Sequence, residues 1–352
     1  MHGGLLPAAD AAGPGCPRRG GCSVSAAGRA CPLRYRYGPA AIAAATPREV
    51  PALYVVGGLY GNRPALDAIE AMARAEAAAP TLCFNGDFHW FDIDDAAFAE
   101  IDARVLAHDA LQGNVEAELV MPTDEAGCGC AYPEHVDAAT VDRSNRIHAR
   151  LKATAARHPV LSARLAALPM MARYHVADCH VGVVHGDAES LAGWRFDVQA
   201  LDDPASQPWL QSVFATAAVD LFASTHTCLP ALRGFDLGAG REGWVANNGA
   251  AGMPNFAGEL AGLCTRIATQ PSPHPVLKEV RVAGAFVALL PVPYPPRRWQ
   301  DEFLRQWPPG SPAWQSYFER ITQGPAFSRA QALQPRAAMR ANATVSGPRP
   351  RS

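Results

Sequence analysis

The chain has 352 residues, of which 49% are hydrophobic, so it is long enough to bury a large core in one or two domains. Its 31 basic and 33 acidic side chains nearly balance, which disfavours nucleic acid or another polyanion as a partner. No apolar run approaches the roughly 18 to 20 residues of a membrane span, and no secretory signal opens the sequence, so we expect a cytoplasmic protein without membrane contact.

Both ends of the sequence differ in composition from its middle. Residues 1–45 are rich in glycine, alanine and proline, and Cys16, Cys22 and Cys31 lie there at spacings that fit no zinc motif. We predict that this segment and the tail at 326–352 are disordered, because neither has the periodic apolar pattern of a packed element. Residues 50–325 are then the folded domain.

Within this domain, short apolar runs alternate with helical stretches. Helices are predicted at about 64–79, 94–108, 137–168 and 209–217. Strands are predicted at 52–56, 81–85, 172–176, 180–184, 221–223 and 244–246. The alternation indicates an α/β protein, in which sites form where the strands end.

Polar segments follow the predicted strands at several such points. They read Gly57-Gly58-Leu59-Tyr60-Gly61-Asn62, Gly86-Asp87, Gly113-Asn114-Val115-Glu116, His185-Gly186 and Thr225-His226-Thr227-Cys228. Together they offer one carboxylate, one amide oxygen and two imidazoles, from Asp87, Asn114, His185 and His226. Mixed nitrogen and oxygen ligands suit a divalent ion of Zn, Fe, Ni or Mn, so we predict a metal site.

The order and spacing of these segments resemble the calcineurin-like metallophosphoesterases, and specifically their small bacterial phosphodiesterase-like branch. The blocks of that family have the forms D-x-H-G-N, G-D, G-N-H-[DE], H-G and G-H-x-H, and the resemblance covers about residues 53–254. It implies a four-layer α/β/β/α sandwich of two mixed β-sheets with helices outside. It also implies hydrolysis of a phosphomonoester or phosphodiester bond in a small phosphorylated substrate.

The resemblance implies that one of the family's two metal sites is retained and the other altered. The ligands of the second metal map onto Asp87, Asn114, His185 and His226, and all four are present. At the first metal, Gly58 replaces an aspartate, Tyr60 a histidine, and Cys228 the last histidine. We therefore expect one metal ion per chain.

The family's general acid is also missing, because Val115 stands at the position of that histidine. By its position two residues after Asp87, His89 could substitute for it, or it could support the metal ligands. Asn62 and Glu116 agree with the family pattern, and we expect the same two kinds of role for them.

Three interpretations remain open from the sequence. The first metal site is discarded, and a single metal ion activates water and polarises the phosphoryl group. Alternatively the site is rebuilt around deprotonated Tyr60 and Cys228, with Cys128 and Cys130 as nearby thiols that act as ligands, undergo redox chemistry or are merely exposed. A third interpretation is a catalytically degenerate scaffold that binds a partner.

Overall fold

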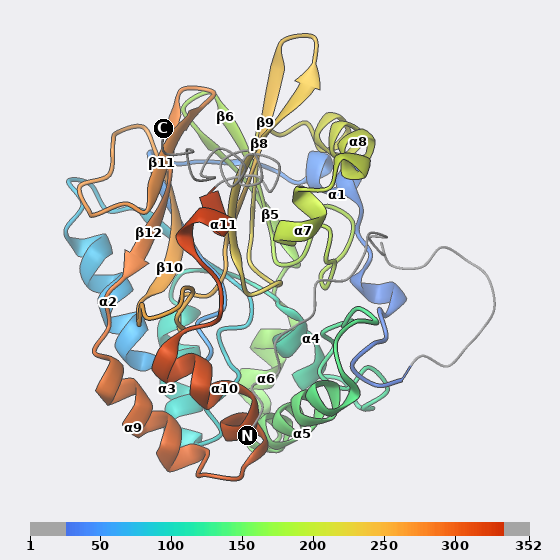
Figure 1. The fold of residues 1–352 in the computed structure, drawn as a ribbon, viewed down its shortest axis with the longest axis vertical. Coiled ribbons are helices and arrows are strands. Elements are labelled where there is room, and N and C mark those ends of the chain that lie inside the picture. The colour runs from blue at the N-terminus through green and yellow to red at the C-terminus, as the bar shows by residue number, and fades with distance from the viewer. Residues whose placement is uncertain (1–25, 334–352) are drawn as a thin grey trace, which may run out of the picture.

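The computed structural model describes residues 26–333, which form two six-stranded mixed β-sheets packed face to face with helices outside (Figure 1). The first sheet has the order β1, β5, β6, β7, β9, β8. Its strands are β1 (Arg48–Glu49), β5 (Met171–Val176), β6 (Cys179–Val184), β7 (Leu221–Ser224), β8 (Pro230–Gly238) and β9 (Arg241–Asn248). Strands β6, β7 and β9 run parallel, so their carboxyl ends share one edge.

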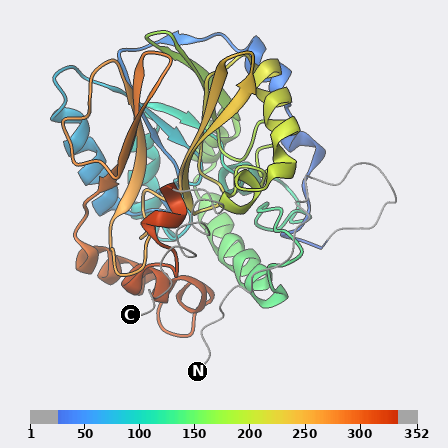
Figure 2. The same cartoon turned by 45° about the horizontal axis from the view of Figure 1, so that its top comes forward.

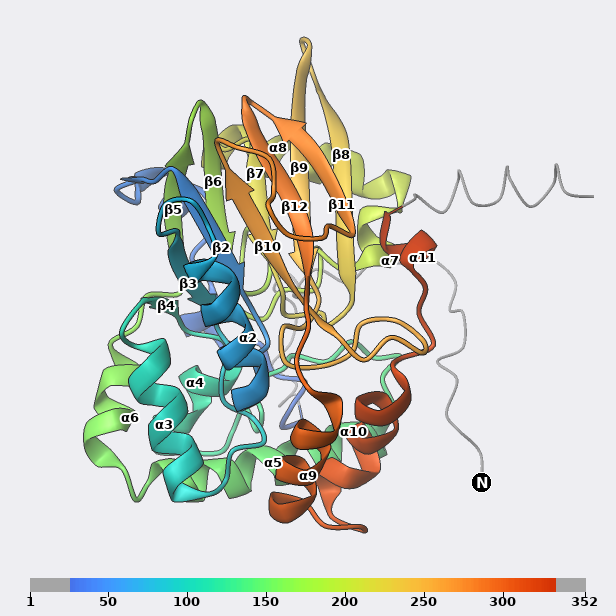
Figure 3. The same cartoon turned by 90° about the vertical axis from the view of Figure 1, so that its left-hand side faces the viewer.

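The second sheet has the order β11, β12, β10, β2, β3, β4. Its strands are β2 (Ala52–Val56), β3 (Thr81–Asn85), β4 (Asp109–Leu111), β10 (Gly262–Ala268), β11 (Lys278–Val282) and β12 (Ala285–Val292). Strands β2, β3 and β4 are parallel and the remainder antiparallel. In Figure 3 the second sheet lies in front of the first, and the end of the β8–β9 hairpin extends above both.

The helices cover the outer faces of the two sheets, as Figure 2 shows for α2 in blue and α8 in yellow-green. The helices and 3-10 turns are η1 (Leu33–Tyr35), α1 (Pro39–Ala44), α2 (Arg63–Arg74), α3 (Asp95–Val105), α4 (Asn114–Leu119), α5 (Ala138–Ala155), α6 (Pro159–Ala166), α7 (Val198–Leu201), η2 (Pro204–Ser206), α8 (Gln207–Ala217), α9 (Pro296–Gln306), α10 (Pro312–Gln323) and α11 (Arg329–Leu333). The predicted four-layer α/β/β/α sandwich is confirmed.

Alternate residues of β2 show how the layers form. Leu53 and Val55 belong to the core between the sheets, whereas Tyr54 and Val56 belong to the core beneath the helices. This follows from the period of two along a strand, which sends successive side chains to opposite faces. A strand buried on both faces reads as a continuous apolar run, which is why 52–56 and 81–85 were predicted with the bounds of β2 and β3.

Two predictions about order and helix length were wrong in part. Residues 26–45 are not disordered: they form η1 and α1, and Tyr35 and Ile42 are fully buried. Cys16 and Cys22 lie outside the described residues. Similarly, α11 lies within the predicted tail, where Ala332 is buried. The single helix predicted at 137–168 is interrupted because Pro159 cannot continue a helix and begins α6 instead.

A buried ion pair joins the second sheet to the loop after α2. The side chains of Arg266 on β10 and Glu76 are 2% and 7% exposed, and their atoms Nε and Oε1 are 2.6 Å apart. The Tyr54 hydroxyl donates to the same carboxylate at 2.6 Å. Burial alone would raise the pKa of Glu76, but the hydrogen bonds and charge of Arg266 hold it below its usual value.

We expect Glu76→Gln to lower the free energy of unfolding by about 3–5 kcal/mol, because it leaves the Arg266 guanidinium buried without a counter-charge. Urea unfolding at neutral pH measures this loss. Folding lowers the pKa of the Glu76 carboxylate. The wild type should therefore have the higher free energy of unfolding above the pKa of Glu76 in the unfolded chain. This difference between wild type and variant should disappear as the pH falls through the pKa of Glu76 in the folded chain. Asp142→Asn, at the exposed Arg146–Asp142 pair, is the control and should cost under about 1 kcal/mol. A similar small loss for both variants would contradict the argument.

Candidate metal centre

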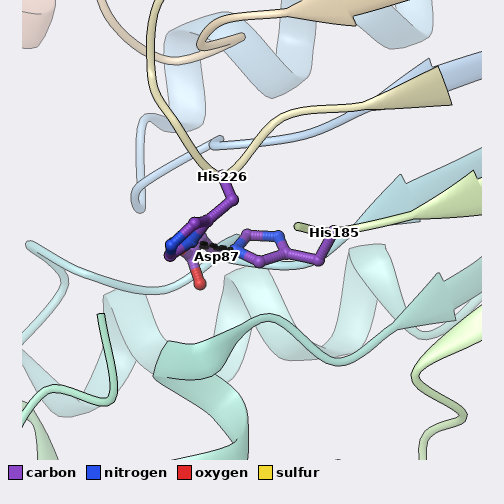
Figure 4. A group of neighbouring side chains, drawn as sticks. All are labelled: Asp87, His185 and His226. Carbon is purple, nitrogen blue, oxygen red and sulfur yellow. Dashed lines mark hydrogen bonds and ion pairs between the residues drawn. The ribbon is translucent and has the colours of Figure 1, made fainter. Parts of the chain in front are cut away.

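Four side chains from four strand ends meet at the edge where the two sheets approach each other. Asp87 follows β3, Asn114 begins α4 after β4, His185 follows β6 and His226 follows β7. One ligand atom from each of Asp87, His185 and His226 lies within 4.8 Å of the others, and Figure 4 shows these side chains pointing toward one another. The structure thus brings together all four residues of the predicted metal site.

The atom His185 Nε2 lies close to all three of the other candidate ligands. This atom is 3.4 Å from Asp87 Oδ2, 3.2 Å from Asn114 Oδ1 and 3.1 Å from His226 Nδ1. The opposite ring nitrogen, Nδ1, is 2.8 Å from the backbone carbonyl of Asn85 and must carry a proton to donate to it. In the neutral ring, Nε2 therefore points an unprotonated lone pair toward the other three side chains.

Backbone carbonyls of the Cys128–Cys130 loop orient two of the ligands. Asn114 Nδ2 donates to the Cys128 carbonyl at 2.9 Å, which turns its Oδ1 toward His185. His226 Nε2 donates to the Cys130 carbonyl at 3.2 Å, which leaves Nδ1 unprotonated and facing inward. Hydrogen bonds from a ligating residue to a backbone carbonyl are the usual way in which proteins fix imidazole ligands.

Glu116 holds the loop that carries Asp87. Its carboxylate accepts hydrogen bonds from the backbone N–H groups of Asp87 at 2.8 Å, Gly113 at 3.0 Å and His89 at 3.2 Å. Gly113 is needed for this close approach, because a Cβ there would lie 2.2 Å from Asp87 Oδ1. Of the two roles predicted for Glu116, the geometry fits support of the ligands.

Burial and neighbouring charge set the protonation of this group. Burial alone would raise the pKa of Asp87, but His185 and His226 hold it below its usual value. Burial alone would lower the pKa of His185, and the Asp87 carboxylate raises it instead. Burial and the charge of His185 lower the pKa of His226 to about 3. Asp87 is thus ionised and His226 neutral, the forms that bind a metal ion.

Two other residues singled out in the sequence have side chains occupied elsewhere. His89 is fully buried, with Nδ1 2.5 Å from Asp92 and Nε2 3.8 Å from Asp102, and its ring stacks on Phe98 at 4.1 Å. Asn62 caps α2 by accepting from the Ala65 N–H, and it donates to the Gly252 carbonyl. These contacts indicate support of the fold around the site for both residues.

One residue beside the site, His148, was not singled out in the sequence analysis. This residue projects from α5, and its Nε2 donates to the carbonyl of Val115 at 3.3 Å. Burial lowers the pKa of His148 to about 4, so its ring is neutral. Nothing in the α5 sequence distinguishes His148 from other helical histidines, since only the packing of α5 against α4 brings it there.

Cys128 and Cys130 lie over the metal centre and are buried rather than exposed. Both are free thiols, with exposures of 0% and 8%. Asn114 Nδ2 approaches Cys130 Sγ to 3.5 Å. Burial raises the pKa of Cys130 well above its usual value, so the thiol form is favoured. Neither cysteine joins the group of Asp87, His185 and His226 that could share one ion.

The three altered positions contact one another. Tyr60 Oη is 2.9 Å from Cys228 Sγ, although the two residues are far apart in the sequence. A Cβ added at Gly58 would lie 3.0 Å from Cε2, Cζ and Oη of Tyr60. The ring of Tyr60 therefore fills the space into which a side chain at position 58 would extend. Burial raises the pKa of both the Tyr60 hydroxyl and the Cys228 thiol.

No family model matches this sequence, and no curated protein matches it. Among solved structures, the chain is similar to a metallophosphoesterase from Sphaerobacter thermophilus, with 17% identity, a TM-score of 0.48, and coverage of 78% of this chain and 100% of that chain. It is also similar to a hypothetical protein from Pyrococcus horikoshii OT3, with 14% identity, a TM-score of 0.51, and coverage of 79% and 100%. At such identities the similarity concerns the fold alone.

This chain shares its fold with the Pyrococcus horikoshii protein. Within that fold each sheet has three parallel strands, namely β2, β3 and β4 in one sheet and β6, β7 and β9 in the other. Their carboxyl ends lie at one edge, where the candidate ligands are found. None of the helices between residues 26 and 333 combines the length and the apolar character that crossing a bilayer requires.

Proposed function

We propose that the chain is a metal-dependent phosphoesterase that hydrolyses a small phosphomonoester or phosphodiester and holds one divalent ion of Mn, Fe, Zn or Ni. The observation that carries this proposal is the meeting of four potential ligand atoms, three of which lie within 3.4 Å of the fourth, His185 Nε2. Asp87 and Asn114 supply oxygens, and His185 and His226 supply nitrogens whose lone pairs face inward. Such a set of buried acceptors is costly unless a cation lies between them.

The residues present fit a metal ion of this kind. Two imidazoles, a carboxylate and an amide oxygen are ligands that these transition metals accept, and each is oriented by a hydrogen bond from outside the group. A bound divalent ion would supply Lewis acidity toward a phosphoryl oxygen and a supply of activated water near neutral pH. Within the chain, Val115 N–H fixes Asp87 Oδ1 at 3.1 Å, so the Oδ2 atom is the one left to face the metal.

The contact between Gly58, Tyr60 and Cys228 supports the interpretation that the first metal site is discarded. Tyr60 fills the space beside Gly58, and its hydroxyl lies 2.9 Å from the Cys228 thiol. Burial raises the pKa of both groups, and Gly58 offers no side chain as a ligand. We infer that these residues form a packed, neutral replacement for the first metal.

We expect one metal ion per chain, and we expect Cys228→Ser to leave that number unchanged. Metal content is measured by mass spectrometry on protein purified without chelators, together with hydrolysis of aryl phosphate and bis-aryl phosphate. Loss of one ion from two in Cys228→Ser would instead favour the rebuilt site. Wild-type protein that holds no metal and hydrolyses neither compound would contradict the proposed function.

That last outcome would favour the second candidate, a catalytically degenerate scaffold that binds a partner. One observation favours it: the candidate ligands are deeply buried, with Asp87 and His226 each only 6% exposed and Asn114 and His185 fully buried. The Cys128–Cys130 loop contacts two of them, since its carbonyls accept hydrogen bonds from Asn114 and His226. The retention of four converging ligands favours the enzyme, because a scaffold gains nothing from burying them together.

A further inference from the structure

A cavity of about 420 Å³ lies between helices α3, α5 and α9, which gather at one end of the molecule (Figures 1 and 3). Its volume falls within the range of small-molecule sites, roughly 300–1,000 Å³. The charged residues of its lining are three arginines and two acids, namely Arg63, Arg150, Arg305, Asp94 and Glu302. None of the candidate metal ligands is among the lining residues.

The two acids in the lining are already engaged. Glu302 accepts from Arg63 at 3.1 Å and from Arg298 at 3.2 Å. Asp94 caps α3, and its Oδ1 accepts from the Ala97 N–H at 3.0 Å. Glu302 is therefore paired with two arginines, whereas the charge of Asp94 is paired with no cation among residues 26–333, and neither carboxylate forms an ion pair with Arg150 or Arg305.

Two of the three arginines form no ion pair with either acid of the lining. Arg63 is paired with Glu100 at 3.0 Å and with Glu302. Arg150 and Arg305 make no ion pair with a carboxylate anywhere in residues 26–333. Arg150 and Arg305 are both exposed, and three arginines against two acids leave the lining positively charged where an anion could enter.

The structure also holds Arg150 in place. Its guanidinium carbon lies 4.5 Å above the ring of Trp307, and that ring is fully buried and fixed by a 2.8 Å hydrogen bond to the Phe91 carbonyl. Stacking on a rigid ring reduces the freedom that Arg150 would lose on binding a ligand. The planar guanidinium can then offer two parallel N–H donors to an oxyanion.

We propose that this cavity binds a small molecule through a phosphate dianion that bridges Arg150 and Arg305. A phosphate has enough oxygens to accept hydrogen bonds from both guanidinium groups at once. The volume accommodates an organic group beyond the phosphate. The site is separate from the metal centre, and it would exist whether or not the proposed phosphoesterase activity does.

Isothermal titration of the full chain with inorganic phosphate and with glucose 6-phosphate tests this proposal, with glucose as the uncharged comparison. We expect both phosphates to bind, glucose not to bind, and affinity to fall as sodium chloride rises. Arg150→Gln and Arg305→Gln should each weaken binding by about tenfold or more, since each removes charge-assisted hydrogen bonds. Arg146→Gln, at an exposed site one turn away on α5, is the matched control and should bind as the wild type does.

His185→Ala distinguishes this cavity from the metal centre, and it should keep phosphate affinity. Circular dichroism melts of the arginine variants verify that they are folded, and Arg150→Lys, which keeps the charge, should recover part of the affinity. The proposal is overturned if wild-type protein binds neither phosphate at millimolar concentration. It is equally overturned if Arg150→Gln and Arg305→Gln bind as wild type, or if His185→Ala alone abolishes binding.

Discussion

Replacing His185 by alanine is expected to remove the bound metal ion and to lower phosphoesterase activity by at least about a thousandfold. His185 Nε2 lies within 3.4 Å of the ligand atoms of Asp87, Asn114 and His226, so its loss opens the ligand group at its middle. Lewis-acid stabilisation by a metal ion is worth several kcal/mol, and each 1.36 kcal/mol corresponds to a factor of ten in rate. Metal content and rate should therefore fall together.

Stability measurements separate loss of metal from simple loss of packing. A metal ion that binds only the folded chain stabilises it by about 2.7 kcal/mol at a hundred times its dissociation constant. The melting temperature of wild-type protein should therefore rise with added metal, and that of His185→Ala should not respond. His180→Ala, on the same strand β6 but stacked on His175 at 4.3 Å, is the control and should keep both metal and response. An equal response of His185→Ala and wild type to metal would exclude His185 as a ligand.

Three of the candidate ligands, Asp87, His185 and His226, follow strands that have a strong local signal in the sequence. Strands such as 81–85 are short apolar runs that end at a glycine, and a residue just beyond a parallel strand must lie at the edge of the sheet. The loop between Pro122 and Pro133 carries no such signal. Its carbonyls at Cys128 and Cys130 orient Asn114 and His226. This arrangement depends on long-range packing, which the spacing of residues in the sequence cannot reveal.

The N-terminal segment was misjudged for a related reason. Its composition is typical of a disordered chain, yet residues 26–38 form individual contacts with helix α4 and the loop after it, far away in the sequence. The Tyr35 hydroxyl donates to Glu118, and Gly28 bonds the backbone of Ala126 and Tyr132. Composition averages over a segment, so it misses a few residues that bond strongly to a folded domain.

Elements after residue 252, including β10, β12 and α10, were likewise not predicted, although they complete the second sheet and its helical cover.

Tyr60 contacts both other altered positions of the first metal site, Gly58 and Cys228, so a substitution at one of them should affect the others. Gly58→Asp alone should lower the free energy of unfolding by about 1–3 kcal/mol through overpacking, since its Cβ would lie 3.0 Å from the buried ring of Tyr60. The ring cannot move aside freely while its hydroxyl is bonded to Cys228. Gly240→Asp is the matched control: Gly240 also has a positive φ, of 74°, but a Cβ there meets nothing within 4 Å.

Combining Gly58→Asp with Tyr60→His and Cys228→His should recover most of that loss and raise the metal content from one toward two ions per chain. The smaller histidine ring vacates the space beside position 58, so the cost of the first substitution should depend on the second, and the effects should not add. Asp87 is already oriented by Glu116 and Val115, so only the outer ligands need rebuilding. Urea unfolding of each single and combined variant, with metal counted in each, measures both effects. The opposite result is a wild type that already holds two ions and a triple variant that gains none. In that case Tyr60 and Cys228 are ligands of a rebuilt site, and they lie close together because they bind the same ion.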